Sequence, residues 1–102
     1  MVFAAKVSEV PDWGKKLVKV NGVDVLLVHV KGEFFACENE CPHQGSPMAG
    51  AFLKDPEHLS CPRHGYRFNL KTGACTQFPE YLLKVYPVQV VGDDIMIGFD
   101  GA

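Results

Sequence analysis

The sequence predicts an all-β fold, an antiparallel β-sandwich or barrel that carries an inserted lobe of two loops. Short apolar stretches alternate with turn residues, and no segment has the length and period of an amphipathic helix. The composition changes to Pro, Gly, His, Cys and Asn between about residues 38 and 80. We therefore expect a single domain over residues 1–102, with a β framework at 1–37 and 81–102 and the lobe at about 38–80.

The first half of the framework is expected to form three neighbouring antiparallel strands. Residues 16–20 alternate apolar and polar side chains and are followed by Asn21-Gly22. This dipeptide is a strong hairpin signal, because both central positions of a type I′ turn need a positive φ. Residues 23–30 form the returning strand, and Lys31-Gly32 turns the chain into a third strand at 33–37.

The second half of the chain offers one hairpin inside the lobe and two strands after it. Lys71-Thr72-Gly73 is expected to close the hairpin. Residues 84–91 and 94–99 return to a strand pattern and are joined by Gly92-Asp93. Pro87 interrupts the first of these strands and indicates a bulge or an unpaired N–H side, because proline cannot donate to a ladder.

Charge and hydropathy exclude several classes of protein. With 102 residues and a formal net charge of −2, the chain has no basic stripe with which to neutralise phosphates, so a nucleic-acid binder is not expected. The longest apolar run, residues 23–30, is interrupted by Asp24 and His29 and is too short to span a bilayer. The N-terminus does not have the pattern of a secretory signal, so we expect a cytoplasmic location.

Two short loops carry the residues that point to chemistry. Cys41-Pro42-His43 and Cys61-Pro62-Arg63-His64 each offer one thiolate and one imidazole. In a cluster of two irons, one iron can take both thiolates and the other both imidazoles, so that each loop serves both irons. A structural zinc site with two Cys and two His is the alternative, although zinc modules usually space the ligands of each pair by two to four residues and have a smaller fold.

The pattern resembles the Rieske [2Fe–2S] motif at every ligand position, and the resemblance extends over essentially the whole chain. It implies a Rieske-like fold with one [2Fe–2S] cluster per chain, held as cofactor and metal site by Cys41, His43, Cys61 and His64. The chain is most similar to the ferredoxins of bacterial aromatic-ring dioxygenase systems. These are soluble one-electron carriers and not enzymes, so no catalytic residue is expected.

The same resemblance implies partners. A flavin-dependent NAD(P)H ferredoxin reductase would be the electron donor, and a terminal oxygenase would be the acceptor of a monomeric carrier. No flavin or nicotinamide fingerprint is present, so the chain cannot act as its own reductase. The alternative is the small Rieske subunit of an assimilatory nitrite reductase, whose large subunit would then be the acceptor.

The ligand set also predicts a range of reduction potential. Two neutral imidazoles in place of two thiolates make the oxidised cluster neutral, which raises the potential from about −400 mV to roughly −150 to +300 mV. High-potential relatives join an extra cysteine of each loop in a disulfide, and their tyrosine hydroxyl bonds a cluster sulfur. Ser46, Arg63 and Phe68 stand at those positions here, so we expect a low potential.

Four further cysteines and histidines lie outside the motif. Cys37 and Cys75 are expected to be free thiols that pack in the interior, because disulfides are rare in a reducing compartment. His29, among apolar neighbours on a strand, is expected to have its hydrogen bonds satisfied within the fold. His58 follows Asp55-Pro56-Glu57 and is interpreted as a solvated loop histidine.

Overall fold

The computed structural model describes residues 1–42, 45, 47–62 and 65–99 of the chain. Over these residues the elements are strands and two 3₁₀ turns, and the strands pair antiparallel, which confirms the predicted all-β class. The 3₁₀ turns are η1 (Val7–Glu9) and η2 (Met48–Gly50). The strands are β1 (Val2–Lys6), β2 (Gly14–Val20), β3 (Val23–Val30), β4 (Glu33–Glu38), β5 (Phe52–Asp55), β6 (His58–Ser60), β7 (Arg67–Asn69), β8 (Val85–Tyr86), β9 (Val88–Val91) and β10 (Asp94–Ile97).

The central sheet has the order β2-β3-β4-β8, so the three antiparallel neighbours predicted from the first half of the chain are confirmed. The turn between β2 and β3 has φ values of 51° at Asn21 and 79° at Gly22, as a type I′ turn requires. The next turn repeats this geometry, with 52° at Lys31 and 76° at Gly32. The backbone of two short turns thus fixes the register of β2, β3 and β4.

The strand predicted at 84–91 is two strands that belong to different sheets. β8 pairs with β4 in the central sheet, whereas β9 pairs with β10 in a second sheet of order β1-β10-β9. Pro87 stands at the break, and its carbonyl accepts a hydrogen bond from the N–H of Gly98 at 3.0 Å. Because proline has no N–H to give to a ladder, the chain leaves one sheet at this residue and enters the other.

The second sheet brings the two ends of the described chain together. β1 pairs with β10, with Val2 opposite Ile97, and an irregularity in register lies between Phe3 and Ala5. Ile95 and Ile97 of β10 are fully buried, in one core with residues of the central sheet. The sequence pattern did not indicate this pairing, because partners so far apart in the chain leave no local signal.

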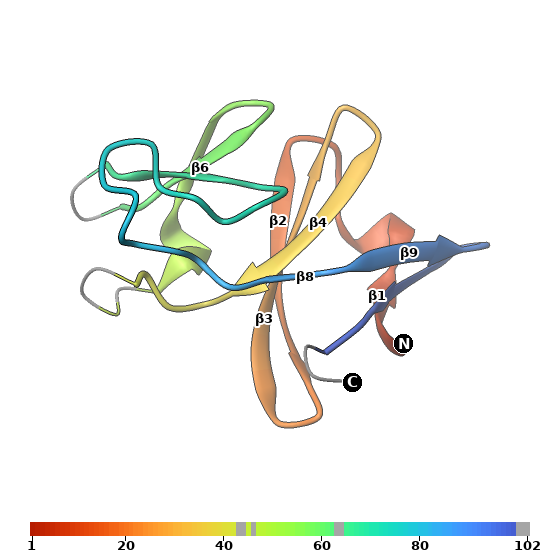
Figure 1. Cartoon of the computed structure of the whole chain (residues 1–102). Helices are drawn as coiled ribbons and strands as arrows, with labels where there is room; N and C mark the ends of the chain where they lie inside the picture. Colours follow the sequence, from red (N-terminus) through yellow and green to blue (C-terminus); the bar gives the residue numbers. More distant parts are fainter. Residues whose placement is uncertain (43–44, 46, 63–64, 100–102) are drawn as a thin grey trace.

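The lobe contains the third sheet, of order β5-β6-β7, which lies at one end of the molecule in Figure 1, away from the N-terminus. The hairpin predicted at 71–73 is present, because the N–H of Gly73 donates to the carbonyl of Asn69 at 2.7 Å. Phe68 and Cys75 then face each other in an isolated bridge. A Cβ at Gly73 would collide with the backbone of Leu83, so this position requires glycine.

His58 does not lie in a loop, so that interpretation is wrong. It is the first residue of β6, and its Nδ1 lies 3.0 Å from a carboxylate oxygen of Asp55. Burial alone would raise the pKa of Asp55, but the backbone N–H of Glu57 and the ring of His58 together lower it. The turn Asp55-Pro56-Glu57 therefore orients this histidine against a carboxylate instead of leaving it in solvent.

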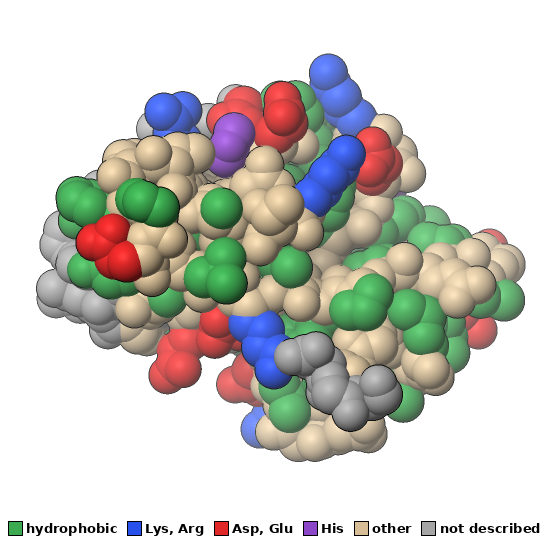
Figure 2. All heavy atoms as spheres, viewed as in Figure 1, with side chains coloured by type: hydrophobic (Ala, Val, Ile, Leu, Met, Phe, Trp, Pro, Cys, Tyr) green, Lys and Arg blue, Asp and Glu red, His purple; other side chains and the backbone are tan. Residues whose placement is uncertain are grey.

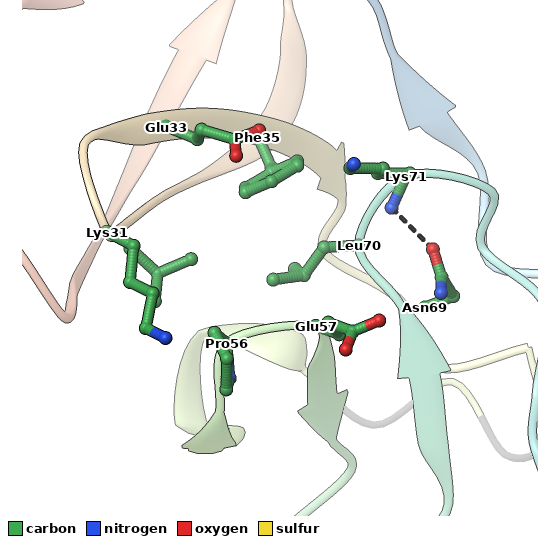
Figure 3. A pocket seen from close by; sticks show the side chains of 9 residues that line it. Lys31, Glu33, Phe35, Pro56, Glu57, Asn69, Leu70 and Lys71 are labelled. Carbon is green, nitrogen blue, oxygen red and sulfur yellow. Dashed lines mark hydrogen bonds between the residues drawn. The ribbon is translucent and has the colours of Figure 1, made fainter.

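A second apolar core joins the lobe to the framework. It contains Leu26, Val28 and Val30 of β3 together with Leu59 and Phe68 of the lobe. At its edge, where the β3–β4 turn faces the lobe, Phe35, Pro56 and Leu70 help to line a cavity of about 240 Å³ (Figure 3). Since the strands of one sheet contribute to both cores, the framework positions the lobe through β3 and β4.

Apolar side chains on the surface are spread over both ends of the molecule and lie among charged ones (Figure 2). On the lobe, Phe52 and Phe78 are exposed, as is Leu82 just after it, and on the second sheet Phe3, Val90 and Val91 are exposed. In the described part of the chain, no helix is long and apolar enough to cross a membrane.

Candidate metal centre

The two motif loops are closed by the same type of hydrogen bond. In the first, the N–H of Gly45 donates to the carbonyl of Cys41 at 2.7 Å, and in the second, the N–H of Gly65 donates to the carbonyl of Cys61 at 3.0 Å. The two glycines have φ values of 72° and 71°, a conformation that favours glycine over other residues. The repeated sequence Cys-Pro-x-x-Gly therefore folds into a repeated turn, with a cysteine at the base of each copy.

Both cysteines of the motif belong to the core that joins lobe and framework. Cys41 and Cys61 are each 2% exposed and pack in one cluster with Met48, Leu59 and Phe68. Burying a thiolate in such surroundings is costly unless a positive charge compensates it, and a bound metal supplies that charge and deprotonates the thiol. The buried pair of sulfurs thus fits a thiolate-bound metal centre.

The predicted imidazole ligands, His43 and His64, lie outside the described residues, as do Ser46 and Arg63. Among the residues that the structure describes, no three His, Cys, Asp or Glu side chains come together in a way that could hold a metal ion. The complete ligand set therefore remains a prediction.

The cysteines outside the motif are buried thiols in no disulfide, as expected. Cys37 is 2% exposed on β4, and burial raises its pKa to about 12. Cys75 is 5% exposed, and its Sγ lies 3.7 Å from Oε1 of Gln77. Cys37 lies on a strand of the central sheet, outside both motif loops.

His29 has the satisfied environment that the sequence predicted. Its Nδ1 lies 2.8 Å from the carbonyl of Val10, and its ring stacks on Phe34 with 4.0 Å between the centroids. The other ring nitrogen lies 3.7 Å from Asp12. These contacts give His29 a structural role in the framework.

An asparagine closes the base of the first loop. The carbonyl of Asn39 accepts a hydrogen bond from the N–H of Met48 at 3.1 Å, and its side-chain Oδ1 accepts one from the N–H of Ala49 at 2.8 Å. Glu40 and Pro47 pair beside it in an isolated antiparallel bridge. The chain before Cys41 is thus tied to the chain that follows the loop.

A glutamine holds the second loop. Its Nε2 donates to the carbonyl of Gly65 at 3.4 Å, and its Oε1 accepts from the N–H of Arg67 at 3.0 Å. This residue is Gln77, which lies ten residues after Arg67 in the chain. The loop is also closed by a hydrogen bond from the N–H of Cys61 to the carbonyl of Tyr66 at 2.8 Å. The roles of Asn39 and Gln77 have no signature in the sequence, because a single amide side chain belongs to no motif.

The surface next to each loop is hollowed and differs in charge. A hollow of about 420 Å³ at the second loop is lined by Pro62, Gly65 and Arg67 among others. The hollow at the first loop, of about 390 Å³, is acidic, with Asp24, Glu38 and Glu40 in its wall. The two loops therefore offer a partner protein different surroundings.

Comparison with known proteins decides what these loops belong to. Residues 1–97 match the family profile described as "Rieske [2Fe-2S] domain". The chain belongs to this family. Its members bind one [2Fe–2S] cluster, for which two cysteines and two histidines are the standard ligands, and the paired cysteine loops of this Rieske domain fit that group.

Proteins similar to the chain include electron carriers of dioxygenases. The chain is 36% identical over 97 residues to the 3-phenylpropionate/cinnamic acid dioxygenase ferredoxin subunit of Photorhabdus laumondii, covering 94% of this chain and 91% of that protein. The ferredoxin of carbazole 1,9a-dioxygenase from Nocardioides aromaticivorans IC177 superimposes with a TM-score of 0.84 at 26% identity, over 94% of each chain. A putative nitrite reductase NADPH small subunit gives a TM-score of 0.87 at 19% identity, covering 96% of this chain and 97% of that one, which shows a shared fold.

Proposed function

We propose that this protein is a Rieske-type ferredoxin that carries single electrons from a flavin-dependent NAD(P)H reductase to a terminal oxygenase. The observation that carries the proposal is the pair of loops closed by the same hydrogen bond, each with a buried cysteine at its base, in a chain that matches dioxygenase ferredoxin subunits over nearly its whole length. The match covers 91% of the Photorhabdus laumondii ferredoxin subunit, so the similarity extends over nearly the whole length of an electron carrier.

We assign Cys41 and Cys61 to one iron and His43 and His64 to the other. The cluster supplies a centre that takes up and releases one electron with little change in structure. The chain's own task is to hold the two loops in place, and Asn39 ties the base of the first loop while Gln77 bonds to the second. The apolar core around the sulfurs keeps water away from the thiolate side.

A partner would approach the loops from outside, where Pro47 and Pro62 are exposed and Phe52 is 54% exposed. Small apolar surfaces of this kind beside charged side chains suit the brief contacts of electron-transfer proteins. In this proposal the framework at 1–37 and 81–102 is the scaffold, and the lobe at about 38–80 is the part that partners meet. The free thiols Cys37 and Cys75 support a reducing, cytoplasmic location.

The second candidate function is that of a small subunit of a nitrite reductase. The likeness to such a subunit is one of fold, whereas the ferredoxin subunits share more than a third of their residues with the chain. A subunit would remain bound to a large partner during purification. A ferredoxin would be recovered alone and would be reduced and reoxidised repeatedly.

The first test is the metal content of the purified protein. We expect a red-brown protein with about two irons and two acid-labile sulfides per chain, which takes up about one electron per cluster in a reductive titration. His43→Ala and His64→Ala should lose this spectrum, and Cys37→Ala and Cys75→Ala should keep it. Zinc in place of iron after anaerobic preparation would overturn the proposed function.

The second test is the transfer itself. The reduced protein, mixed in a stopped-flow instrument with a ring-hydroxylating oxygenase encoded beside its gene, should be oxidised in a single step. If it transfers no electrons to the oxygenase but binds tightly to a nitrite reductase, the second candidate function is correct.

A further inference from the structure

One lysine of the framework reaches across to the lobe. Lys15 of β2 donates from Nζ to the carbonyl of Ala49 at 3.0 Å and to the carbonyl of Ala51 at 2.6 Å, both partly buried bonds. These carbonyls are 34 and 36 residues away in the sequence and follow the first motif loop. A hydrogen bond from a charged donor is stronger than one between neutral groups, so Lys15 is a firm link between the central sheet and this segment.

The segment that Lys15 holds is η2, and it contacts both motif loops. On one side, the N–H of Ala49 donates to Oδ1 of Asn39 at the base of the first loop, and Met48 is fully buried. On the other side, a Cβ built on Gly50 would lie 3.8 Å from Cγ of Pro62, an ordinary contact distance, so the turn lies against the second loop. Any shift of η2 would therefore change the separation of the two loops.

The register of the sheet directs Lys15 toward the lobe. Lys15 is paired with Val28, which belongs to the core that contains both motif cysteines. The next residue, Lys16, is paired with Leu27, which belongs to the other core. Since successive side chains of a strand point to opposite faces, the two lysines serve different sides of one sheet.

We propose that Lys15 is a positioning residue of the cluster. Through the carbonyls of Ala49 and Ala51 it fixes η2, and through η2 it fixes the separation of the two loops. Its positive charge, held on the lobe side of the sheet, also favours the reduced cluster over the oxidised one, because reduction adds a negative charge. The inference rests on the proposed cluster site.

The test compares three variants of the holoprotein. Lys15→Met keeps the length of the side chain but removes its charge and its donors. Lys15→Arg keeps the charge and the donors. Lys16→Met removes the same charge from the opposite face of the strand, where Nζ of Lys16 lies 3.6 Å from Glu9. The readouts are the reduction potential and the rate at which an iron chelator bleaches the cluster.

We expect Lys15→Met to lose its cluster about tenfold faster than the unmodified protein, as the loss of a charge-assisted hydrogen bond implies. Its potential should be lower than that of Lys16→Met, and Lys15→Arg should be close to the unmodified protein in both readouts. Equal potentials and equal bleaching rates for Lys15→Met and Lys16→Met would overturn the proposal. So would a lower melting temperature of Lys15→Met with both readouts unchanged, because Lys15 would then stabilise only the fold.

A second measurement needs no variant and applies even if Lys15→Met does not fold. Brief acylation of the unmodified holoprotein with an amine-reactive ester, followed by peptide mass spectrometry, should modify Lys15 at least several-fold more slowly than Lys16, and removal of the cluster should reduce the difference. Equal modification of the two lysines in the holoprotein would overturn the proposal. If the unmodified protein contains a [2Fe–2S] cluster, either failure concerns Lys15 alone, and if it contains none, the proposed function fails first.

Discussion

The two motif loops are closed by the same type of hydrogen bond, but different contacts hold them in the fold. Each is a Cys-Pro-x-x-Gly turn closed by a bond from the glycine N–H to the cysteine carbonyl. The second loop connects β6 to β7, two strands that pair directly with each other. In the first loop no such ladder is present among the described residues, and its ends are joined by Asn39 and by an isolated bridge.

This difference shows which structural features a short motif determines by itself and which depend on the rest of the fold. Five residues suffice to shape a turn and to present a cysteine at its base, because the bond and the positive φ lie within the motif. The separation of two such turns depends on residues elsewhere, namely a ladder and Gln77 for one loop, and Asn39 with η2 for the other. We call these residues the supports of the turns. Changes in the turns and changes in their supports should therefore have different effects.

The largest expected effect follows from changing a motif cysteine. Because each loop is proposed to serve both irons, Cys41→Ser and Cys61→Ser should be equally damaging, although their loops are held differently. We expect both variants to lack the normal [2Fe–2S] absorption and EPR spectra, as measured on protein purified without air.

Cys75→Ala is the matched control, since it removes a buried thiol of the same lobe and should keep the cluster. If one serine variant kept a normal cluster, the two loops would not be equivalent in ligation, and the proposed assignment would be wrong.

The next effect concerns the supports. Asn39→Ala removes the acceptor of the partly buried N–H of Ala49, which costs about 1–3 kcal/mol, whereas Gln77→Ala removes exposed bonds worth about 0.5–1.5 kcal/mol. We expect the chelator to bleach the cluster about tenfold faster in Asn39→Ala and a few-fold faster in Gln77→Ala. Bleaching rates at one temperature give the comparison.

Asn39→Asp serves as a control, because it keeps the side-chain oxygen that accepts from the N–H of Ala49. Gln77→Glu keeps the acceptor for the N–H of Arg67 but loses the Nε2 donor to Gly65, so it separates the two bonds of Gln77. If Gln77→Ala were the faster of the two alanine variants, the ladder between β6 and β7 would contribute less to the second loop than its hydrogen bonds suggest.

Much of the framework could be predicted from short-range signals. Asn21-Gly22 and Lys31-Gly32 set the hairpins of β2, β3 and β4, because their φ values decide the turn type locally. The pairing of β1 with β10, and the change of sheet at Pro87, depend on partners far away in the chain and were not predictable in detail. His58 was misplaced for the same reason, since its strand exists only through its pairing with β5 and β7.

The candidate metal centre likewise has parts that local sequence predicts and parts that depend on distant residues. The motif marked Cys41 and Cys61 as the important thiols, and the structure buries both in one core. Asn39, Gln77 and Lys15 were not predictable, because a hydrogen bond from a side chain to a distant backbone group depends on the folded arrangement and not on local spacing.

A smaller effect should follow from a change between the loops. Phe68 is fully buried in the core that contains both motif cysteines, and it has no hydroxyl to offer a ligand sulfur. Phe68→Tyr should raise the reduction potential, by up to roughly 60 mV if a hydrogen bond of about 1.5 kcal/mol forms to the reduced cluster. Protein-film voltammetry measures the shift.

Phe78→Tyr is the control for this prediction, because Phe78 lies on the same lobe but is 39% exposed, and its new hydroxyl would be hydrated. We expect no shift from it. A lower potential in Phe68→Tyr would contradict the expectation.

The smallest effect on the cluster is expected from Cys37, a buried thiol of the framework that is proposed not to bind metal. Burial raises its pKa from 9.0 to about 12, so the folded protein keeps this proton over a pH range in which the unfolded chain loses it. Its contribution to stability is complete below pH 9 and is lost as the pH rises toward about 12. Unfolding of the apoprotein by urea should therefore show a shallower loss of stability over this range in Cys37→Ala than in the unmodified chain.

At pH 8, after removal of the cluster, iodoacetamide should modify Cys41 and Cys61 before Cys37, because only local opening of a loop exposes the first two, whereas Cys37 lies on a central strand. Equal modification of all three thiols would mean that the framework opens together with the loops, and the distinction between turns and supports would then not hold in the apoprotein.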